Sequence, residues 1–99
     1  MRIEYAAQAV VEVDEVLAYY RAIDPALSTR LVDEIEEALR LIQVMPLGWK
    51  PIEDDLRQRR LKVFPYVFIY AVRTDLIGIV AFAHTHRRPQ YWSDRLSKP

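Results

Sequence analysis

Ionisable and aromatic side chains gather at the point where an apolar segment of this chain ends. Residues 84–92 read His-Thr-His-Arg-Arg-Pro-Gln-Tyr-Trp and directly follow the apolar run 77–83. Cleavage of RNA by attack of its own 2′-hydroxyl requires a general base, an acid for the leaving 5′-oxygen and cations that stabilise the phosphorane. Side chains of these types at one end of a sheet are able to perform all three tasks. We therefore take His86, Arg87 and Tyr91 as candidate catalytic residues.

Two histidines of this segment, His84 and His86, are separated by one residue. Alternate residues of a strand project from the same face, so we expect both imidazoles on one side of the sheet. A metal site normally needs three or four ligands, and no nearby side chain completes one, so no metal or cofactor is expected. For His84 the simpler interpretation is a strand residue that is hydrogen-bonded at the sheet edge.

A second basic group precedes the apolar segments and consists of Arg57, Arg59, Arg60 and Lys62. Together with Arg88, these side chains are candidates for binding the phosphates of RNA. The alternative is a solubilising edge strand, because charged residues on an exposed edge prevent unwanted pairing. The Tyr-Trp pair near the C-terminus also has two interpretations, which are stacking on bases and packing against the core.

The apolar segments that must position these residues have the character of β-strands. Residues 66–72 and 77–83 are rich in β-branched and aromatic types, and the polar turn 73–75 separates them. Such near-continuous apolar runs are typical of strands that are covered on at least one face. Within residues 57–64, Leu61 and Val63 alternate with Arg60 and Lys62, which predicts a half-buried strand with one basic face. Residues 2–5 alternate over a shorter length and predict a brief first strand.

Helical periodicity dominates the first half of the chain. Between residues 6 and about 22, apolar side chains recur at helical spacing, and Glu12, Asp14 and Glu15 take the opposite side. Several of the apolar residues are valines, which lower helix propensity, so we expect packing against the rest of the domain to hold this helix. The apolar stripe consists of Val10, Val13, Val16, Leu17, Tyr20 and Ile23.

Asp24 and Pro25 mark the start of a second helix that runs to about Val44. Asp at the N-cap accepts a hydrogen bond from the free amides of the first turn, and Pro fits the first helical position. A link this short predicts an antiparallel helical hairpin. The exposed side is acidic, which we interpret as a solvated face; its alternative role is repulsion that keeps nucleic acid on the opposite side. The acidic residues are Asp33, Glu34, Glu36 and Glu37, and the apolar stripe is Leu27, Leu31, Ile35, Ala38, Leu39 and Ile42.

The predicted order of elements is β-α-α-β-β-β within a single domain of residues 1–99. This order indicates an α+β fold in which an antiparallel helical hairpin packs on one face of a small, mainly antiparallel sheet. Residues 48–56 are interpreted as a loop. The other face of the sheet is expected to be open and partly basic, which is the outline of an anion-binding surface.

The net charge of zero conceals a strong segregation of charge along the chain. Residues 1–55 contain 5 Lys/Arg and 12 Asp/Glu, a net charge of −7, whereas residues 56–99 contain 9 and 2, a net charge of +7. Such a basic half favours an anionic partner. The chain has no cysteine and no apolar run of the length that a membrane span needs. We therefore expect a cytoplasmic protein without disulfides and without a membrane partner.

Several of these residues, taken in order, carry a family resemblance. After the helical hairpin come Arg59-Arg60, then Phe64-Pro65-Tyr66, then the two apolar strands, and finally 84–89 and the Tyr-Trp pair. The chain resembles the RelE/ParE family of bacterial toxins over nearly its whole length. The resemblance implies a growth-inhibiting toxin, of a kind often labelled plasmid stabilisation, that is neutralised by a cognate antitoxin in a hetero-oligomer.

Two modes of action occur in this family. RelE-like members cut mRNA on the ribosome without a metal, and the positions that match their motif here are Arg60, Lys62, Arg87 and Tyr91. ParE-like members lack that catalytic set and inhibit DNA gyrase. The His86-Arg87 and Tyr91 pattern favours a ribosome-dependent endoribonuclease, whereas a pI of about 6.7 departs from the strongly basic character of that branch. Gyrase inhibition is therefore kept as the alternative.

Overall fold

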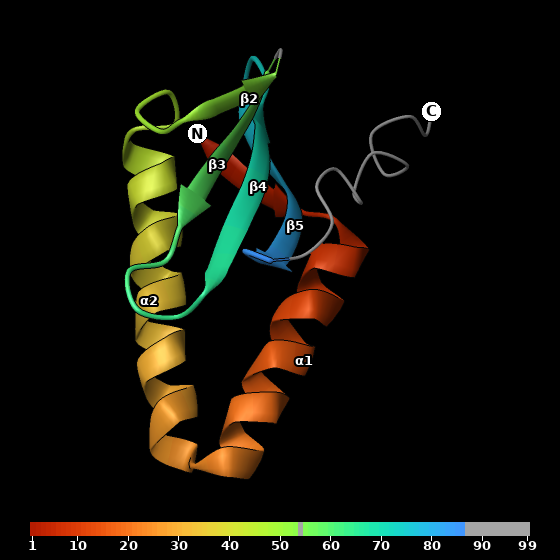
Figure 1. Ribbon diagram of the computed structural model, residues 1–99. Helices are drawn as coiled ribbons and strands as arrows, with labels where there is room; N and C mark the ends of the chain where they lie inside the picture. The colour runs from red at the N-terminus through yellow and green to blue at the C-terminus, as the bar shows by residue number, and fades with distance from the viewer. Residues whose placement is uncertain (54, 87–99) are drawn as a thin grey trace.

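The hairpin of two helices and a five-stranded sheet form the two layers of this protein (Figure 1). The computed structural model describes residues 1–53 and 55–86. The elements are β1 (Arg2–Tyr5), α1 (Ala7–Ile23), α2 (Pro25–Val44), β2 (Pro51–Glu53), β3 (Leu56–Arg60), β4 (Tyr66–Val72) and β5 (Leu76–His84). The α+β class and the helical hairpin on one face of the sheet are confirmed.

The boundary between the helices follows the predicted start signal. The Asp24 Oδ1 accepts a hydrogen bond from the Ala26 N–H at 3.0 Å, and Pro25 occupies the first position of α2. The Asp24 N–H in turn donates to the Tyr20 carbonyl at 2.9 Å, so one residue ends α1 and begins α2. The helices run in opposite directions and open from this vertex as a V, with the sheet across the open end (Figure 1).

Helix α2 buries the predicted stripe, while α1 differs from the prediction in two respects. Leu31, Ile35, Ala38 and Ile42 are buried. In α1, Val10 and Ile23 belong to the expected stripe but are 45% and 59% exposed. Glu12, expected on the solvent side, instead accepts a hydrogen bond from the Phe82 N–H of β5 at 3.0 Å. Glu12 therefore lies on the side of α1 that meets the sheet, whereas Asp14 and Glu15 are exposed.

The sheet has the strand order β1-β5-β4-β3-β2, in which β1 pairs with β5 in parallel and all other pairs are antiparallel. The mainly antiparallel character is therefore confirmed. The interpretation of residues 48–56 as a loop is wrong in part, because Pro51–Glu53 form the edge strand β2. This strand is too short for an alternation signal and its register against β3 is irregular. Its pairing is a tertiary contact, not a local preference.

Strand β3 ends at Arg60, four residues before the predicted end. The Glu34 Oε1 of α2 accepts hydrogen bonds from the backbone N–H groups of Lys62 and Val63, each at 3.1 Å. Leu61 and Phe64 are both buried while Val63 is 65% exposed. A strand would have placed Leu61 and Val63 on the same face. The three-residue spacing of the buried side chains is that of a turn anchored on α2.

A bulge in β5 changes which residues of that strand face the helices. Tyr70 lies opposite Ile79 and Ile69 lies opposite Ala81, so Val80 is inserted between them. An inserted residue reverses the alternation of the strand beyond it. His84, which an unbroken strand would place opposite to Ile79, therefore shares the helix-facing side with that residue.

The face of the sheet away from the helices is mostly apolar and buried, which corrects the expectation of an open, partly basic surface for β4 and β5. Arg60 of β3 lies at the border of this face. The buried residues of the face belong to β3, β4 and β5, and Ile52 of β2 packs against them. These residues are Leu56, Val67, Ile69, Ala71, Val80, Ala81 and Ala83. Because β4 and β5 are apolar at consecutive positions, they supply side chains for both faces and leave no basic face between them.

Tyr70 ties the centre of the sheet to the end of α2. Its side chain is fully buried, and its hydroxyl donates a hydrogen bond to the Pro46 carbonyl at 2.7 Å. Replacing Tyr70 with Phe removes this bond and keeps the ring, so we expect the free energy of unfolding to fall by about 1 kcal/mol at pH 7.

The same variant predicts a pH dependence. Burial raises the pKa of Tyr70 to about 12, compared with about 10 for an unfolded tyrosine. The folded protein therefore binds the phenol proton more tightly, and its stability falls as the pH rises from about 10 to about 12. In urea unfolding at pH 7, 9 and 11, the difference between wild type and Tyr70→Phe should narrow above pH 10. A difference that stays constant would contradict this prediction.

Candidate functional site

The two histidines lie close together at the end of β5. His84 is the last residue of the strand and His86 lies in the turn beyond it, with the two ring centroids 5.3 Å apart. The His86 backbone N–H donates to His84 Nδ1 at 3.0 Å, which places the proton of a neutral His84 ring on Nε2. The rings are neighbours because of this turn and not because of strand alternation. Arg87, Arg88 and Tyr91 lie outside the described residues.

The basic residues of β3 are divided between the two faces of the sheet. Arg59 lies opposite Phe68, whose side chain belongs to the core beneath the helices. Arg60 lies opposite Val67, whose side chain belongs to the cluster on the other face. Strand β2 pairs with Leu56 and Arg57 of β3, so the interpretation as a solubilising edge strand is wrong for Arg57. Arg59 and Arg60 lie beyond this pairing.

Two of the arginines make contacts that hold the loop before β2. The Arg57 Nη1 donates to the carbonyl oxygens of Trp49 at 2.8 Å and Leu47 at 3.3 Å. The Arg59 guanidinium carbon lies 4.1 Å from the centroid of the Trp49 ring, a cation–π contact. Both side chains therefore have a structural partner.

A hollow of about 170 Å³ lies between the basic segment 59–62 and α2. Its lining includes Arg59, Arg60 and Lys62 on one side and Asp33, Glu34 and Glu37 on the other. A hydrogen bond from Arg40 lowers the pKa of Glu37, and the charges of Lys62 and Arg59 lower it further. Since Glu37 feels these cations, their field is partly cancelled within the protein. The hollow carries as many acidic as basic residues and does not attract anions as a purely basic pocket would.

The divided roles of the arginines predict different effects of their removal. Arg59→Ala should lower the free energy of unfolding by about 1 kcal/mol, because the cation–π contact with Trp49 is lost. Arg60→Ala should change it by less than about 0.5 kcal/mol, as for other exposed residues. Arg59→Lys is the control for charge, since it keeps a cation without the planar group. Equal effects of the two alanine substitutions in chemical unfolding would contradict the structural role of Arg59.

No group of three or more His, Asp or Glu side chains within residues 1–53 and 55–86 is arranged to hold a metal ion. In that same part of the chain, no helix has the length and apolar character needed to cross a membrane.

A family model described as "ParE toxin of type II toxin-antitoxin system, parDE" matches residues 3–89. The chain belongs to the ParE toxin family. The resemblance noted from the sequence is thereby confirmed, and the toxin of such a two-component system has a cognate antitoxin as its partner.

A comparison with solved structures supports the fold of this ParE-family toxin. The chain is similar to a structure titled "Chromosomal ParDE TA system from P. aeruginosa", with a TM-score of 0.72 and 19% sequence identity. The match covers 85% of this chain and 95% of that chain. A search of curated proteins finds no match to the sequence.

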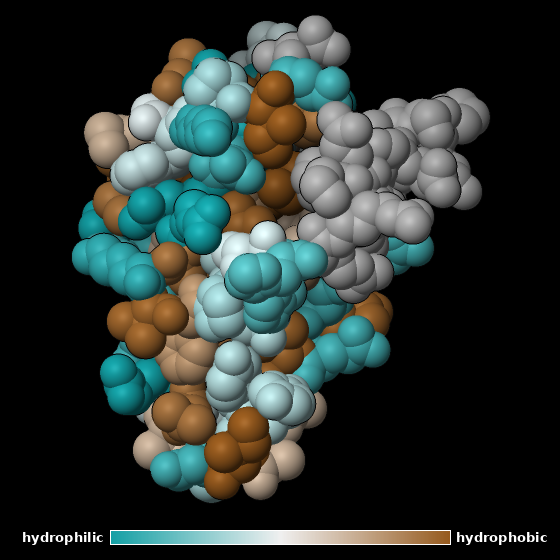
Figure 2. Space-filling view, in the orientation of Figure 1, coloured by the Kyte–Doolittle hydropathy of each residue, from teal (hydrophilic) through white to brown (hydrophobic). Residues whose placement is uncertain are grey.

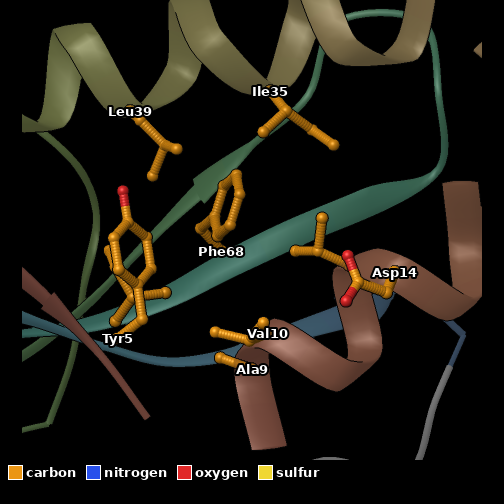
Figure 3. A pocket seen from close by; sticks show the side chains of 9 residues that line it. Tyr5, Ala9, Val10, Asp14, Ile35, Leu39 and Phe68 are labelled. Carbon is orange, nitrogen blue, oxygen red and sulfur yellow. The ribbon is translucent and has the colours of Figure 1, made fainter. Parts of the chain in front are cut away.

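Two surfaces beside α1 escaped the sequence analysis. One is an apolar groove of about 200 Å³ between the helices and the sheet, in which the Phe68 ring stands among side chains of α1, α2 and β1 (Figure 3). The other is a larger hollow on α1 lined partly by Glu15, Tyr19 and Tyr20. The four-residue spacing of Glu15 and Tyr19 was a usable signal, because it places these two on one side of a helix.

Proposed function

We propose that this ParE-family toxin inhibits growth by acting on DNA gyrase and not by cutting mRNA. The observation that carries the proposal is the neutralised hollow around Arg59, Arg60 and Lys62. A ribosome-dependent nuclease needs free cations on the sheet to bind RNA phosphates and to stabilise the phosphorane. Here Arg59 is stacked on Trp49, and α2 contributes three carboxylates to the same hollow. An inhibitor that acts through its surface has no such requirement.

The hydrogen bonding of His84 and the raised pKa of Tyr66, near the end of β5, also favour a non-enzymatic action. His84 uses Nδ1 to accept the His86 N–H, so this nitrogen is not free to take a proton from a 2′-hydroxyl. Burial raises the pKa of Tyr66 to about 12, so its phenol stays protonated and is not a base at neutral pH. Among the predicted catalytic residues, His86 lies in the described part of the chain, and its exposed side chain still fits that role.

The test is to express the toxin in cells, follow translation and DNA supercoiling in parallel, and assay purified toxin on gyrase. We expect inhibited supercoiling by gyrase and gyrase-linked DNA damage, while mRNA stays intact. Arg87→Ala and Tyr91→Ala are the variants that separate the alternatives. Early arrest of translation with mRNA cuts that both variants abolish would overturn the gyrase proposal and establish the endoribonuclease.

We also propose the apolar groove of Figure 3 as the surface that the antitoxin covers. Tyr5 of β1 and Val10 of α1 line it and are 49% and 45% exposed, while Phe68 forms its floor. Large apolar side chains also reach the surface elsewhere, interspersed with hydrophilic residues (Figure 2). The groove differs because its exposed apolar residues gather around a cavity, which suits the apolar face of an amphipathic helix.

Val10→Asp tests this assignment. A carboxylate in the groove should weaken antitoxin binding about 30-fold or more, the effect of losing a central interface residue. Val63→Asp is the matched control, since Val63 is 65% exposed and lies in the turn after β3. Binding is measured by calorimetry on folded variants, with circular dichroism to verify the fold. Equal affinities of the Val10 and Val63 variants would place the antitoxin elsewhere.

A further inference from the structure

A hollow of about 420 Å³ lies between α1 and the ends of β4 and β5, separate from the apolar groove. Helix α1 contributes Glu15, Tyr19 and Tyr20, and the strands contribute Tyr66 and His84. Val16 completes the lining among the described residues. This size is within the range of small-ligand sites, which is about 300–1,000 Å³.

The rings of this hollow stand at steep angles to one another. Tyr20 is inclined by 85° to Tyr19 and by 83° to Tyr66, and Tyr66 is inclined by 81° to His84. The ring centroids of these pairs lie 5.1, 6.2 and 5.2 Å apart. Rings in a continuous stack cover each other's faces, whereas rings in edge-to-face contact meet as the walls of a corner and leave part of their faces uncovered. Such walls are characteristic of aromatic cages that surround a cation.

The packing of the surrounding residues explains how this corner is formed. Tyr66 stacks on Phe82 at 5.2 Å with an interplanar angle of 13°, which anchors its ring on the sheet. Tyr20 packs edge-on against Phe64 at 5.1 Å, and the turn that carries Phe64 is anchored on α2 by Glu34. His84 reaches this side of the sheet because of the bulge at Val80. The corner is therefore held by core contacts and not by its own surface residues.

We infer that this aromatic hollow receives an arginine side chain of a protein partner. Glu15 also lines the hollow and supplies a negative charge there. A guanidinium group is planar and weakly hydrated, so it stacks on aromatic rings and pairs with a carboxylate at the same time. His84 Nδ1 already accepts the His86 N–H, so this nitrogen is engaged within the chain.

Charge complementarity selects a cationic side chain over a nucleotide. Glu15 belongs to α1, whose charged residues are Glu12, Asp14, Glu15 and Arg21, which give the helix a net charge of −2. A nucleobase would also stack on the tyrosines, but its phosphate would have to approach this acidic helix. The hollow also lies on the other flank of α1 from Val10 and Asp14, which line the apolar groove. An arginine in it need not compete with an occupant of the groove.

The experiment is a titration of the full-length toxin, followed by nuclear magnetic resonance of the tyrosine rings and the histidine imidazoles. Nα-acetyl-arginine methylamide is the probe. The citrulline analogue has the same shape without the charge. Guanosine monophosphate tests whether a nucleotide binds in the hollow instead. We expect saturable shifts with the arginine probe in the millimolar range and about tenfold weaker binding of the citrulline analogue.

Two variants make the result specific to the hollow. Glu15→Gln should weaken binding of the arginine probe about fivefold, whereas Asp14→Asn, its neighbour facing the groove, should leave it unchanged. Equal binding of the arginine and citrulline probes, tighter binding of guanosine monophosphate, or no saturation by the arginine probe would each overturn the inference. The titration contains neither gyrase nor ribosomes, so its outcome is independent of the toxin's cellular target.

Discussion

Replacing Phe68 with alanine should lower the free energy of unfolding by about 3–5 kcal/mol, the largest effect that we expect from a single substitution in this protein. Phe68 is 1% exposed at the centre of β4, and its ring lies 4.7 Å from that of Phe82. The ring also projects into the space between the two diverging helices, where it forms the floor of the groove (Figure 3). Because the helices are splayed here, neither is positioned to collapse into the cavity that alanine would leave.

Ile69→Val is the matched control for this substitution. Ile69 is also 1% exposed, but its side chain lies on the opposite face of the same strand. Removing one methyl group there should cost about 0.5–1.5 kcal/mol. Both variants are compared with wild type by urea unfolding. A cost for Phe68→Ala no larger than that for Ile69→Val would mean that the helices close over the cavity.

Replacing Glu12 with alanine is expected to have the second largest effect, a loss of about 2 kcal/mol. The Glu12 carboxylate accepts the Phe82 N–H at 3.0 Å, two residues beyond the bulge at Val80. Phe82 is 2% exposed, so its N–H would lose this partner in a buried environment. Alanine is the better helix former, so a loss of stability cannot come from helix propensity in α1.

The isosteric variant Glu12→Gln distinguishes the hydrogen bond from other effects. Its amide oxygen also accepts a hydrogen bond, so we expect it to retain more than half of the stability that Glu12→Ala loses. Glu36→Ala, on the exposed face of α2, should change stability by less than about 0.5 kcal/mol. If hydrogen exchange of the Phe82 amide is no faster in Glu12→Ala than in wild type, the carboxylate does not hold this part of β5.

Local signals in the sequence were sufficient for most of the elements. Asp24 and Pro25 act within one helical turn, through a side-chain cap and a preset backbone angle, so the boundary between the helices was predictable. The stripe of α2 and the apolar runs of β4 and β5 are likewise properties of contiguous residues. Burial on both faces of the sheet could also have been read from those runs, because they lack alternation.

Other features depended on partners that are distant in the sequence. Strand β2 exists because Pro51–Glu53 meet β3, and its three residues carry no periodic signal of their own. The turn after β3 replaces the predicted strand because Glu34, 28 residues away from Lys62, accepts its N–H. A carboxylate on α2 thus redirects a segment whose alternation alone favours a strand.

The sequence by itself determined the residue types available to this toxin, the helices and main strands that carry them, and the family resemblance. Only the tertiary structure decided which of those residues meet. The alternation of β3 sends Arg59 and Arg60 to opposite faces, and the α2 carboxylate Glu37 lies in the field of Arg59 and Lys62, which partly cancels their charge. The bulge at Val80 turns His84 towards α1, where it meets Tyr66. A one-residue shift in register reverses the face of every later side chain in the strand, and the amino-acid composition does not indicate where such a shift occurs.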